Sequence, residues 1–440
     1  MKLRPTQDKA SQAIAPAPRL LLADVGAGKT ATALTALRQR TGRTLVLGTK
    51  RICDLVWGHE IATWAPEYTY ASVAGRPPIE RRLIMKNEAI DIIGMNFENL
   101  IWAAQTFGDE LPAMFPNLII DESSKLENPA SKSFRAIKPL LPLFKWRLPM
   151  TGTPRANHLH DIWGSVYLAD LGATLGQYKE AFLQTFFVQV TRAGRPAWIP
   201  RHNSEELINA RIKDVVYRMP FEWHPPVEID ISIKQPRDVK EIQKEIDARI
   251  KDDLLTIDGV TYARLGCRVN SKILQLSSGK IYTDDGDVQF IHTDKYDALD
   301  EIVKEAKGEP MMVVYIFDHE KETILSNYPQ CKLLDSDEVL NDWNAGKIEM
   351  LLVHPKSCGH GLNAQLGGCD LQVWFTPTTD AELYTQTVGR LNRPGNPKVV
   401  RVMRLIMQGT KDKASYLVVA ARQRGENATL DSFEDDDHDS

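Results

Sequence analysis

The sequence predicts an α/β protein with two parallel-sheet lobes and a mostly helical segment between them. Short apolar runs alternate with helical patterns over residues 1–150, and the same alternation returns from about residue 291. The runs are continuously apolar rather than alternating, which is typical of parallel strands covered on both faces. Strand–helix alternation of this kind indicates a doubly wound sheet.

Five apolar runs in the first half each predict a buried strand that ends at a polar turn. They are RLLLAD (19–24), TLVLGT (44–49), IDIIGM (90–95), NLIIDE (117–122) and KWRLPMTGTP (145–154). Segments of helical composition lie between them, such as TATALTALRQR at 30–40. In the second half we expect a helix at 294–307 and strands at 310–317, 348–355, 369–377 and 397–407.

The middle of the chain has a different pattern. Its helical stretches are GQYKEAFLQTFF (176–187), SEELINARIKDVV (204–216) and RDVKEIQKEIDARIKDDL (237–254), and its turn-rich stretches are TRAGRPAWIP (191–200) and FEWHPPVE (221–228). We therefore expect a first lobe at 1–155, a mostly helical insertion at 156–290 and a second lobe at 291–425. For residues 426–440 we expect an acidic, disordered tail.

Composition excludes several classes of protein. The 440 residues include 54 Lys and Arg against 58 Asp and Glu, and 43% are hydrophobic, which is the balance of a soluble globular protein of two or three domains. No run approaches the ~18 apolar residues that a membrane span needs. Without the six acids of residues 431–440 the count is 54 against 52, a net charge of +2. Any nucleic-acid site must therefore be a local groove rather than a global basic field.

The five cysteines are scattered and none forms a C-x-x-C pair. This argues against a disulfide framework or a zinc ribbon and favours a reducing, cytoplasmic environment. Most tryptophans lie in apolar or amphipathic stretches, so we expect them to pack in cores rather than stack on bases.

The strongest local signal is LLADVGAGKTATAL at 21–34, in which an apolar strand runs into a glycine-containing turn and then a helix. Gly26 and Gly28 permit a loop whose N–H groups point at an anion, and Lys29 adds a cation over the terminal phosphates. The Thr30 hydroxyl can ligate Mg²⁺. The usual first glycine of the pattern is Ala23 here, and the alternative is an ordinary glycine-rich turn. The predicted ATP-binding loop is Asp24, Val25, Gly26, Ala27, Gly28, Lys29 and Thr30.

The partner of a phosphate loop is an acidic strand end, which NLIIDESS at 117–124 supplies. We expect Asp121 to hold Mg²⁺ through water and Glu122 to orient the attacking water. This separates metal binding from base chemistry, as phosphoryl transfer requires. By itself, an apolar run that ends in Asp-Glu is usually a strand meeting a loop.

With these two motifs the chain resembles the superfamily 2 helicases and translocases, and more narrowly the short, phage-encoded members of the Swi/Snf-type branch. The resemblance runs in order along nearly the whole chain. Its motifs are LRPTQ (3–7), ADVGAGKT (23–30), LVLGTKRICDLVWGHEIATW (45–64), DIIGMNFENL (91–100), IIDESSKLEN (119–128), LPMTGTPRAN (148–157), SCGHGLNAQ (357–365) and QTVGRLNRPGN (386–396). Val25, Ala27 and the Ser-Ser after Glu122 depart from the commoner family residues.

The resemblance implies two tandem RecA-like domains with parallel sheets, an ATP-binding one at 1–155 and a helicase-type one at 291–425. It implies ATP and Mg²⁺ as ligands and a monomer in the cytoplasm, that of the host if the chain is phage-encoded. It assigns adenine contact to Gln7. It assigns coupling of nucleotide state to Thr151, Gly152, Thr153 and Gly361.

The last motif can also be interpreted without the family. Gln386, Arg390 and Arg393 are spaced i, i+4 and i+7, which predicts one face of a helix. Arginines on one face offer planar donor forks to phosphate oxygens. If that face closes over the phosphate loop, Arg390 or Arg393 becomes an arginine finger, worth about 10³–10⁵ in rate in related chemistry. The alternative is a solvated basic face.

Together these features predict a motor that hydrolyses ATP between its lobes and translocates on double-stranded DNA. Small hydroxyls, amides and backbone N–H groups suit sequence-independent phosphate contact. The residues expected to contact nucleic acid are Thr49, Lys50, Asn96, Ser357 and His360. One alternative is a strand-separating DNA or RNA helicase. Another, of a different class, is a non-hydrolysing binding or recruitment module, against which the intact catalytic set argues: Lys29, Asp121, Glu122, Arg390 and Arg393.

Overall fold

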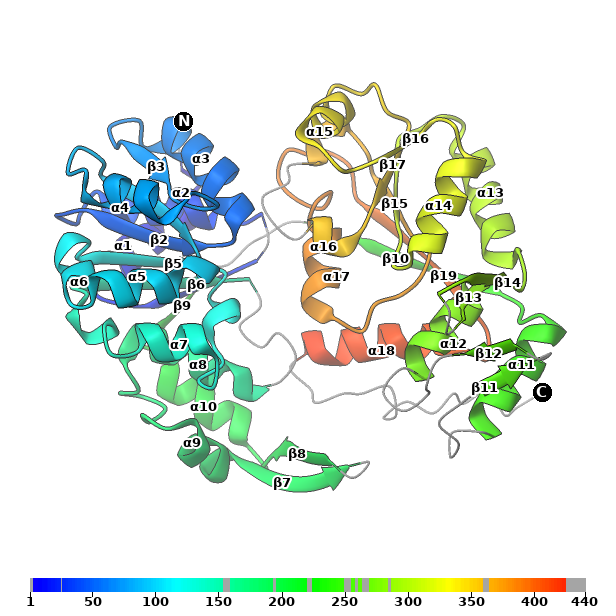
Figure 1. The fold of residues 1–440 in the computed structure, drawn as a ribbon, viewed down its shortest axis with the longest axis horizontal. Helices are drawn as coiled ribbons and strands as arrows, with labels where there is room; N and C mark the ends of the chain where they lie inside the picture. Colours follow the sequence, from blue (N-terminus) through cyan, green and yellow to red (C-terminus); the bar gives the residue numbers. More distant parts are fainter. Residues whose placement is uncertain are drawn as a thin grey trace. The chain divides into compact units, whose positions relative to one another are not determined.

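The computed structural model describes residues 3–24, 26–152, 159–192, 195–219, 224–248, 255–257, 260–262, 269–283, 286–358 and 364–424 (Figure 1). The chain divides into two compact units, Met1–Glu222 and Trp223–Ser440. Each unit is an α/β structure with its own large parallel sheet, which confirms the predicted fold class. No helix of the described part is long and apolar enough to cross a membrane.

The first unit has a seven-stranded sheet in the order β3-β4-β2-β5-β6-β1-β9, and every neighbouring pair is parallel. The strands are β1 (Leu20–Ala23), β2 (Thr44–Gly48), β3 (Tyr70–Ser72), β4 (Ile92–Asn96), β5 (Asn117–Asp121), β6 (Trp146–Thr151) and β9 (Val216–Met219). Four of the seven fall within the apolar runs that the sequence marks as strands, and β4 extends one residue beyond its run. β3 and β9 are short edge strands without such a run.

Helices cover both faces of this sheet, as the continuous apolar runs predict. They are α1 (Pro5–Ile14), α2 (Lys29–Leu37), α3 (Trp57–Trp64), α4 (Pro78–Lys86), α5 (Leu100–Phe107), α6 (Glu110–Met114), α7 (Lys132–Ile137), α8 (Ile162–Asp170), α9 (Lys179–Phe186) and α10 (Ser204–Ile212). Leu20 and Leu22 pack on the face that α5–α10 cover, whereas Leu21 and Ala23 pack against α1, α2 and α3. Successive residues of a strand point to opposite faces, so both faces need an apolar cover.

The second unit has a six-stranded parallel sheet in the order β10-β19-β18-β15-β17-β16. The strands are β10 (Val227–Ile233), β15 (Met311–Val314), β16 (Cys331–Leu333), β17 (Met350–Val353), β18 (Leu371–Trp374) and β19 (Arg401–Met407). The helices are α11 (Arg237–Ala248), α12 (Val269–Ser277), α13 (Asp294–Ala306), α14 (Asp318–Asn327), α15 (Asp337–Asn344), α16 (Pro355–Cys358), α17 (Ala381–Val388) and α18 (Asp412–Gln423).

The segment 156–290 is shared between the two units. β9 pairs with β1 of the first sheet, and β10 pairs along seven residues with β19 of the second. The turn-rich stretch 191–200 forms most of an antiparallel hairpin of β7 (Phe187–Arg192) and β8 (Arg195–Pro200). Two further small hairpins are β11 (Leu255–Ile257) with β12 (Val260–Tyr262), and β13 (Lys280–Tyr282) with β14 (Val288–Phe290). The four expected domain limits stay a prediction, and the tail 426–440 lies outside the described residues.

Large aromatic side chains fill the cores, as expected for the tryptophans. Trp57, Trp146, Trp163, Trp343 and Trp374 are all fully buried. Trp64 and Trp102 are partly buried and pack against the two core clusters of the first unit. These rings are therefore core residues rather than an exposed stacking surface.

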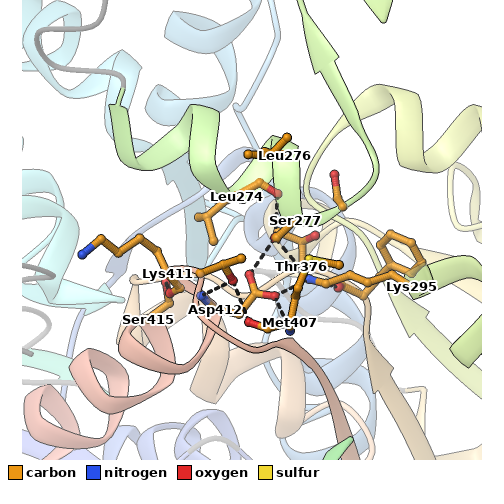
Figure 2. A network of polar contacts seen from close by, with 12 residues as sticks. Leu274, Leu276, Ser277, Lys295, Thr376, Met407, Lys411, Asp412 and Ser415 are labelled. Atoms are coloured by element: carbon orange, nitrogen blue, oxygen red, sulfur yellow. Dashed lines mark hydrogen bonds and ion pairs between the residues drawn. The ribbon is translucent and has the colours of Figure 1, made fainter. Parts of the chain in front are cut away.

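A buried ion pair joins three helices of the second unit (Figure 2). Lys295 of α13 and Asp412 at the start of α18 have fully buried side chains, and their Nζ and Oδ2 atoms are 2.7 Å apart. Ser277, the last residue of α12, donates to Asp412 Oδ1 at 2.8 Å, and the Met407 N–H donates to Oδ2 at 3.0 Å. Lys295 also donates to the Phe375 carbonyl at 3.1 Å. The pair is well satisfied, and it fixes the start of α18 to α12, α13 and the end of β19.

Removing one partner of this pair leaves an uncompensated buried charge. We expect Lys295→Met to lower the free energy of unfolding of the second unit by about 3–5 kcal/mol. The double variant Lys295→Met/Asp412→Asn recovers part of that loss, because no charge is left buried. The one amide oxygen can still accept from the Met407 N–H, while the amide NH₂ can donate to the Ser277 hydroxyl oxygen. Urea unfolding monitored by far-UV circular dichroism measures both. The control is Lys347→Met, which removes the exposed partner of Asp342 and changes little. Equal losses in Lys295→Met and Lys347→Met would contradict the prediction.

Candidate functional site

The predicted phosphate loop lies between the end of β1 and the start of α2. Gly26 and Gly28 have φ angles of 81° and 85°, and Gly28 is the residue before the first turn of α2. The positive φ of Gly28 is strained for any residue with a Cβ, and such a Cβ would also meet the side-chain amide of Gln7, so this position favours glycine. The loop therefore has the strand–turn–helix geometry that the sequence predicts. Val25 lies outside the described residues.

Lys29 and Thr30 lie in the first turn of α2, where backbone N–H groups have no partner within the helix. The Lys29 ammonium donates to the Ala23 carbonyl at 3.0 Å and to the Asp24 carbonyl at 3.4 Å. These carbonyls belong to the loop itself, so the cation is held at the loop. A helix N-terminus with an adjacent ammonium is a binding site for phosphate.

The N-terminal helix α1 is attached to this loop. Gln7 is 4% exposed; its Oε1 accepts from the Arg4 N–H at 2.8 Å and its Nε2 donates to the Ala27 carbonyl at 3.4 Å. The Arg4 guanidinium also donates to the Ala27 carbonyl. Gln7 thus lies at the phosphate loop, and its contact with adenine stays a prediction. Arg4 is a loop contact that the sequence reasoning missed, since it precedes the helix and carries no spacing signal.

The acidic strand end reaches the same edge of the sheet. Asp121 ends β5, next to β6, and β6 in turn pairs with β1. Its Oδ2 accepts from the Trp57 indole N–H at 3.0 Å. Burial raises the pKa of Asp121 to about 6, assisted by the charge of Glu122 and opposed by Lys29 and the Trp57 hydrogen bond. Lys29 of the phosphate loop therefore lies close enough to Asp121 to favour its charged form.

Glu122 is held in a strained conformation. Its φ is +62°, in the left-handed region that non-glycine residues seldom adopt, at a cost of about 1–2 kcal/mol. Its Oε2 atom is buried and has no hydrogen-bond partner among the described residues. A buried carboxylate oxygen is costly unless a donor or a cation meets it. The side chain is therefore suited to receive a water molecule or a hydrated metal ion.

Trp57 contributes a hydrogen bond to the site in addition to its packing in the core. It begins α3 directly after a π-helical segment, Ile52–Val56. Such segments are rare in proteins overall, and many of them lie at functional sites. The ring is fully buried, as predicted for core packing, but its N–H is the hydrogen-bond donor to Asp121. In the sequence, the signal for this residue is its position in the motif at 45–64.

The residues expected to couple nucleotide state in the first unit lie at the adjacent strand end. Thr151 ends β6 and is fully buried, and its register partner on β1 is Leu22. Gly152 follows directly. The carboxyl ends of β1, β6 and β5 thus bring the loop, Thr151 and Asp121 to one edge of the sheet. Thr153 and, in the second unit, Gly361 and His360 lie outside the described residues.

The residues expected to contact nucleic acid in this unit are on β2 and β4. Gly48 of β2 is in register with Asn96, which ends β4, and Thr49 follows at once. Thr49 Oγ1 is buried without a partner among the described residues, whereas Asn96 is occupied by Glu98 and Asn99.

Lys50 is exposed and lines a surface cavity of about 610 Å³. Asp54, Ser72, Gly75 and Arg76 share this cavity. Lys50 and Arg76 give it two cations and Asp54 one anion. This is the local concave surface next to Thr49 that a groove-type contact requires.

The arginine motif of the second unit differs from the expected geometry. Gln386 lies on α17, but that helix ends at Val388, so Arg390 and Arg393 follow it in a series of turns rather than on its face. Gly389 ends the helix, and Pro394 disfavours helical geometry at Arg393. Neither arginine is on a solvated face: Arg390 is 5% and Arg393 8% exposed.

These turns hold Arg393 through a local hydrogen bond, since its Nε donates to the Gly389 carbonyl at 2.7 Å. Gln386 Nε2 donates to Glu382 at 2.9 Å. Ser357 is exposed on α16, which packs against α17. The structure thus brings Ser357 and the arginine motif to neighbouring elements of the second unit, while their roles stay predictions.

Comparison with known proteins agrees with this arrangement. The SNF2-related domain family matches residues 16–219. A putative protein p41 of Acyrthosiphon pisum secondary endosymbiont phage 1 is 30% identical over 439 residues, covering 93% of this chain and 92% of the phage protein. The ISWI chromatin-remodeling complex ATPase ISW1 of Saccharomyces cerevisiae is 23% identical, covering 90% of this chain but 37% of the yeast protein.

The SWI2/SNF2 ATPase core of Sulfolobus solfataricus, solved in complex with dsDNA, is 18% identical. It aligns over 98% of this chain and 93% of that chain, with a TM-score of only 0.42. The phage relative matches along more than nine-tenths of both sequences at the higher identity. With the SNF2-related match at residues 16–219 and a relative along the whole chain, this protein belongs to the SNF2-related family.

Proposed function

We propose that this chain is an ATP-dependent motor that hydrolyses ATP to translocate along double-stranded DNA. The observation that carries the proposal is the carboxylate of Glu122, which is strained in its backbone and has a buried oxygen without a partner among the described residues. It lies beside Asp121, at the sheet edge that also holds the phosphate loop. Membership of a family of helicase-like ATPases supports the same conclusion.

In this mechanism the N–H groups of the loop and of the first turn of α2 bind the triphosphate. Lys29 moves from the carbonyls of Ala23 and Asp24 to the terminal phosphates, because an anion is a stronger partner than a neutral carbonyl. Glu122 accepts a hydrogen bond from a water molecule and aims it at the γ-phosphorus. As the water oxygen bonds to phosphorus, the bond from phosphorus to the β,γ-bridging oxygen breaks, ADP leaves, and Glu122 receives the proton of the water.

The oxygen donors of this site fit Mg²⁺. Asp121 and Thr30 offer the carboxylate and hydroxyl oxygens that this cation prefers, and the Oε2 of Glu122, which has no partner among the described residues, can accept a hydrogen bond from a coordinated water. When bound, Mg²⁺ neutralises charge on the β- and γ-phosphate oxygens. Trp57 keeps the carboxylate of Asp121 oriented toward the loop and stabilises its ionised form.

We further propose that Arg390 and Arg393 of the second unit complete the site on the same triphosphate. A γ-phosphate that both units contact has different affinity for closed and open states, so binding favours closure and hydrolysis releases it. Thr151, Gly152 and Thr153 with Gly361 would transmit that change. The side-chain amide of Gln7 would contact the adenine base.

The proposed track is the phosphate backbone of duplex DNA. Thr49, Lys50 and Asn96 of the first unit and Ser357 and His360 of the second are its candidate contacts. None of these side chains needs to read a base, so binding is expected to be independent of sequence. A motor that moves along any sequence requires this.

The test is the steady-state ATPase rate of the chain with duplex DNA, single-stranded DNA, duplex RNA or no nucleic acid. Strongest stimulation by duplex DNA, without strand displacement, supports translocation. Robust displacement of a labelled strand would favour the helicase alternative. No turnover with any of these would favour a non-hydrolysing binding module.

Substitutions of Lys29 and Glu122 are expected to have different effects on nucleotide binding and ATP turnover. Lys29→Ala weakens binding of a fluorescent ATP analogue and abolishes stimulated turnover, because the phosphate cation is removed. Glu122→Gln retains nucleotide binding but lowers turnover by about 10²–10⁴, the usual contribution of a positioned base. The matched control is Lys145→Ala, which removes an exposed cation from the opposite edge of the same sheet. Unchanged turnover in Glu122→Gln would refute the assigned base.

Trp57→Phe is expected to raise the Mg²⁺ concentration for half-maximal ATPase by about tenfold, since a hydrogen bond to a charged group contributes about 1.5–3 kcal/mol. The control is Trp146→Phe, a buried tryptophan of the same unit whose N–H donates to the Ile14 carbonyl instead. Melting temperatures of both variants report the shared loss of packing. If the two variants had the same Mg²⁺ dependence, Trp57 would be a packing residue only.

Arg393→Ala is expected to reduce stimulated turnover by about 10³ or more while most ATP affinity remains, as for an arginine finger. Single-turnover ATPase and nucleotide binding separate the two effects. The control is Arg237→Ala, which removes an exposed arginine from the same unit. Wild-type turnover in Arg393→Ala would rule out a site shared by the two units.

A further inference from the structure

The two arginines of the second unit lie in a segment without regular secondary structure, residues 389–396, which forms successive turns between α17 and β19. The backbone hydrogen bonds within these turns are local, such as that from the Asn396 N–H to the Arg393 carbonyl at 3.1 Å. Local turns seldom hold one conformation by themselves, because fixing each residue costs conformational entropy. Arg390 and Arg393 are nevertheless buried. Contacts from outside the turns must therefore hold the segment in place.

A buried amide side chain attaches the far end of this segment to the sheet. Asn396 is 0% exposed, and its Nδ2 donates to the Cys369 carbonyl at 2.8 Å and to the Leu391 carbonyl at 3.2 Å. Its Oδ1 accepts from the Lys398 N–H at 3.1 Å. Leu391 lies between the two arginines, and Cys369 lies two residues before β18. Asn396 thus joins the middle of the arginine segment to the start of a strand.

A second buried amide attaches the near end. Gln372, the second residue of β18, donates from Nε2 to the Thr387 carbonyl at 3.1 Å, and both residues are fully buried. Its Oε1 accepts from the Trp374 indole N–H at 3.1 Å. Thr387 is in the last turn of α17, directly before the segment begins. Because β18 pairs with β15 on one side and β19 on the other, both attachments are made to a strand inside the sheet.

The backbone of the segment in turn fixes the stem of Arg393, whose Nε donates to the Gly389 carbonyl at 2.7 Å. Gly395 has a φ of 104°, in the left-handed region that favours glycine, and this turn lets the Asn396 side chain reach back to Leu391. A change at Asn396 is therefore expected to move the guanidinium of Arg393.

We propose that Asn396, together with Gln372, is a positioning residue for Arg393. This rests on the proposed function, in which Arg393 completes the site on the triphosphate, and it gives a role to two buried amides that the expected site leaves out. The printed hydrogen bonds of Asn396 are all to backbone groups, so it acts through the arginine. A donor that is held in place before the reaction stabilises the developing charge without reorganisation.

The test measures ATPase turnover and affinity for a fluorescent ATP analogue in the full chain. Asn396→Ala is expected to lower turnover, with the most stimulating nucleic acid, by about 10–10², the effect of a displacement of about 1 Å in a catalytic group. ATP-analogue affinity is expected to stay near the wild-type value. Asn396→Gln keeps the amide and is expected to recover part of the turnover. Gln372→Met removes the other attachment at similar volume and is expected to act in the same direction, which provides a second test if Asn396→Ala does not fold.

The matched control is Asn117→Ala in the first unit. Asn117 is 2% exposed, and its Nδ2 donates to the Thr41 and Gly42 carbonyls at 3.1 and 3.0 Å. It begins β5, at the other end of the strand from Asp121. Melting temperatures are expected to fall in both Asn117→Ala and Asn396→Ala, because each loses a buried amide with two carbonyl partners. Turnover well below either melting temperature is expected to fall only in Asn396→Ala.

The double variant Asn396→Ala/Arg393→Ala separates positioning from general damage. If Asn396 acts through Arg393, the substitution Asn396→Ala has little further effect once Arg393 is absent, because residues that act as a unit are not additive. Single-turnover ATPase measures the residual rates. Losses that multiply in the double variant would show damage independent of Arg393 and would refute the positioning role.

The other outcomes are also decisive. Wild-type turnover in both Asn396→Ala and Gln372→Met would refute the positioning role and leave the motor intact. Equal losses of turnover in Asn396→Ala and Asn117→Ala would make Asn396 a folding residue only. An active wild-type chain with an equally active Arg393→Ala would overturn the shared site and this inference with it. Absence of turnover in the wild-type chain with duplex DNA, single-stranded DNA and duplex RNA would refute the proposed function itself.

Discussion

The parallel pairing of β1, β6 and β5 is the constraint on which the site of the first unit depends. In a parallel sheet all carboxyl ends lie at the same edge, so residues far apart in sequence meet there. Asp121 opposes Met150, and Thr151 opposes Leu22, one residue before the end of β1. A one-residue slip in either pairing would turn the side chains to the other face and separate the acids from the loop.

Packing around this edge determines its electrostatics. Asp121 is buried, and its raised pKa reflects the loss of water more than any single neighbour. The indole of Trp57 and the charge of Lys29 oppose that effect, so the ionised form is supported from both sides. Glu122 differs from Asp121 because its backbone is strained and one of its oxygens has no partner among the described residues. Adjacent acids in such different environments are suited to different tasks.

The second unit is organised by a polar core of another kind. Lys295, Asp412 and Ser277 join α12, α13 and α18 through contacts that water does not reach. Such a network contributes little net stability, but it tolerates no unpaired member, and it therefore restricts how the start of α18 can move. The arginine motif is likewise buried, which requires its turns to be held in place rather than solvated.

The sequence by itself determined the fold class, most central strands, the glycine turn and the acidic strand end, because hydrophobic periodicity and glycine positions act locally. It did not determine the edge strands β3 and β9, whose pairing depends on neighbours far along the chain, nor the end of α17 at Val388. The hydrogen bond from Trp57 to Asp121 spans 64 residues and has no local signature. Only the tertiary structure decided these features, because burial, register and cross-strand contacts arise when distant segments meet.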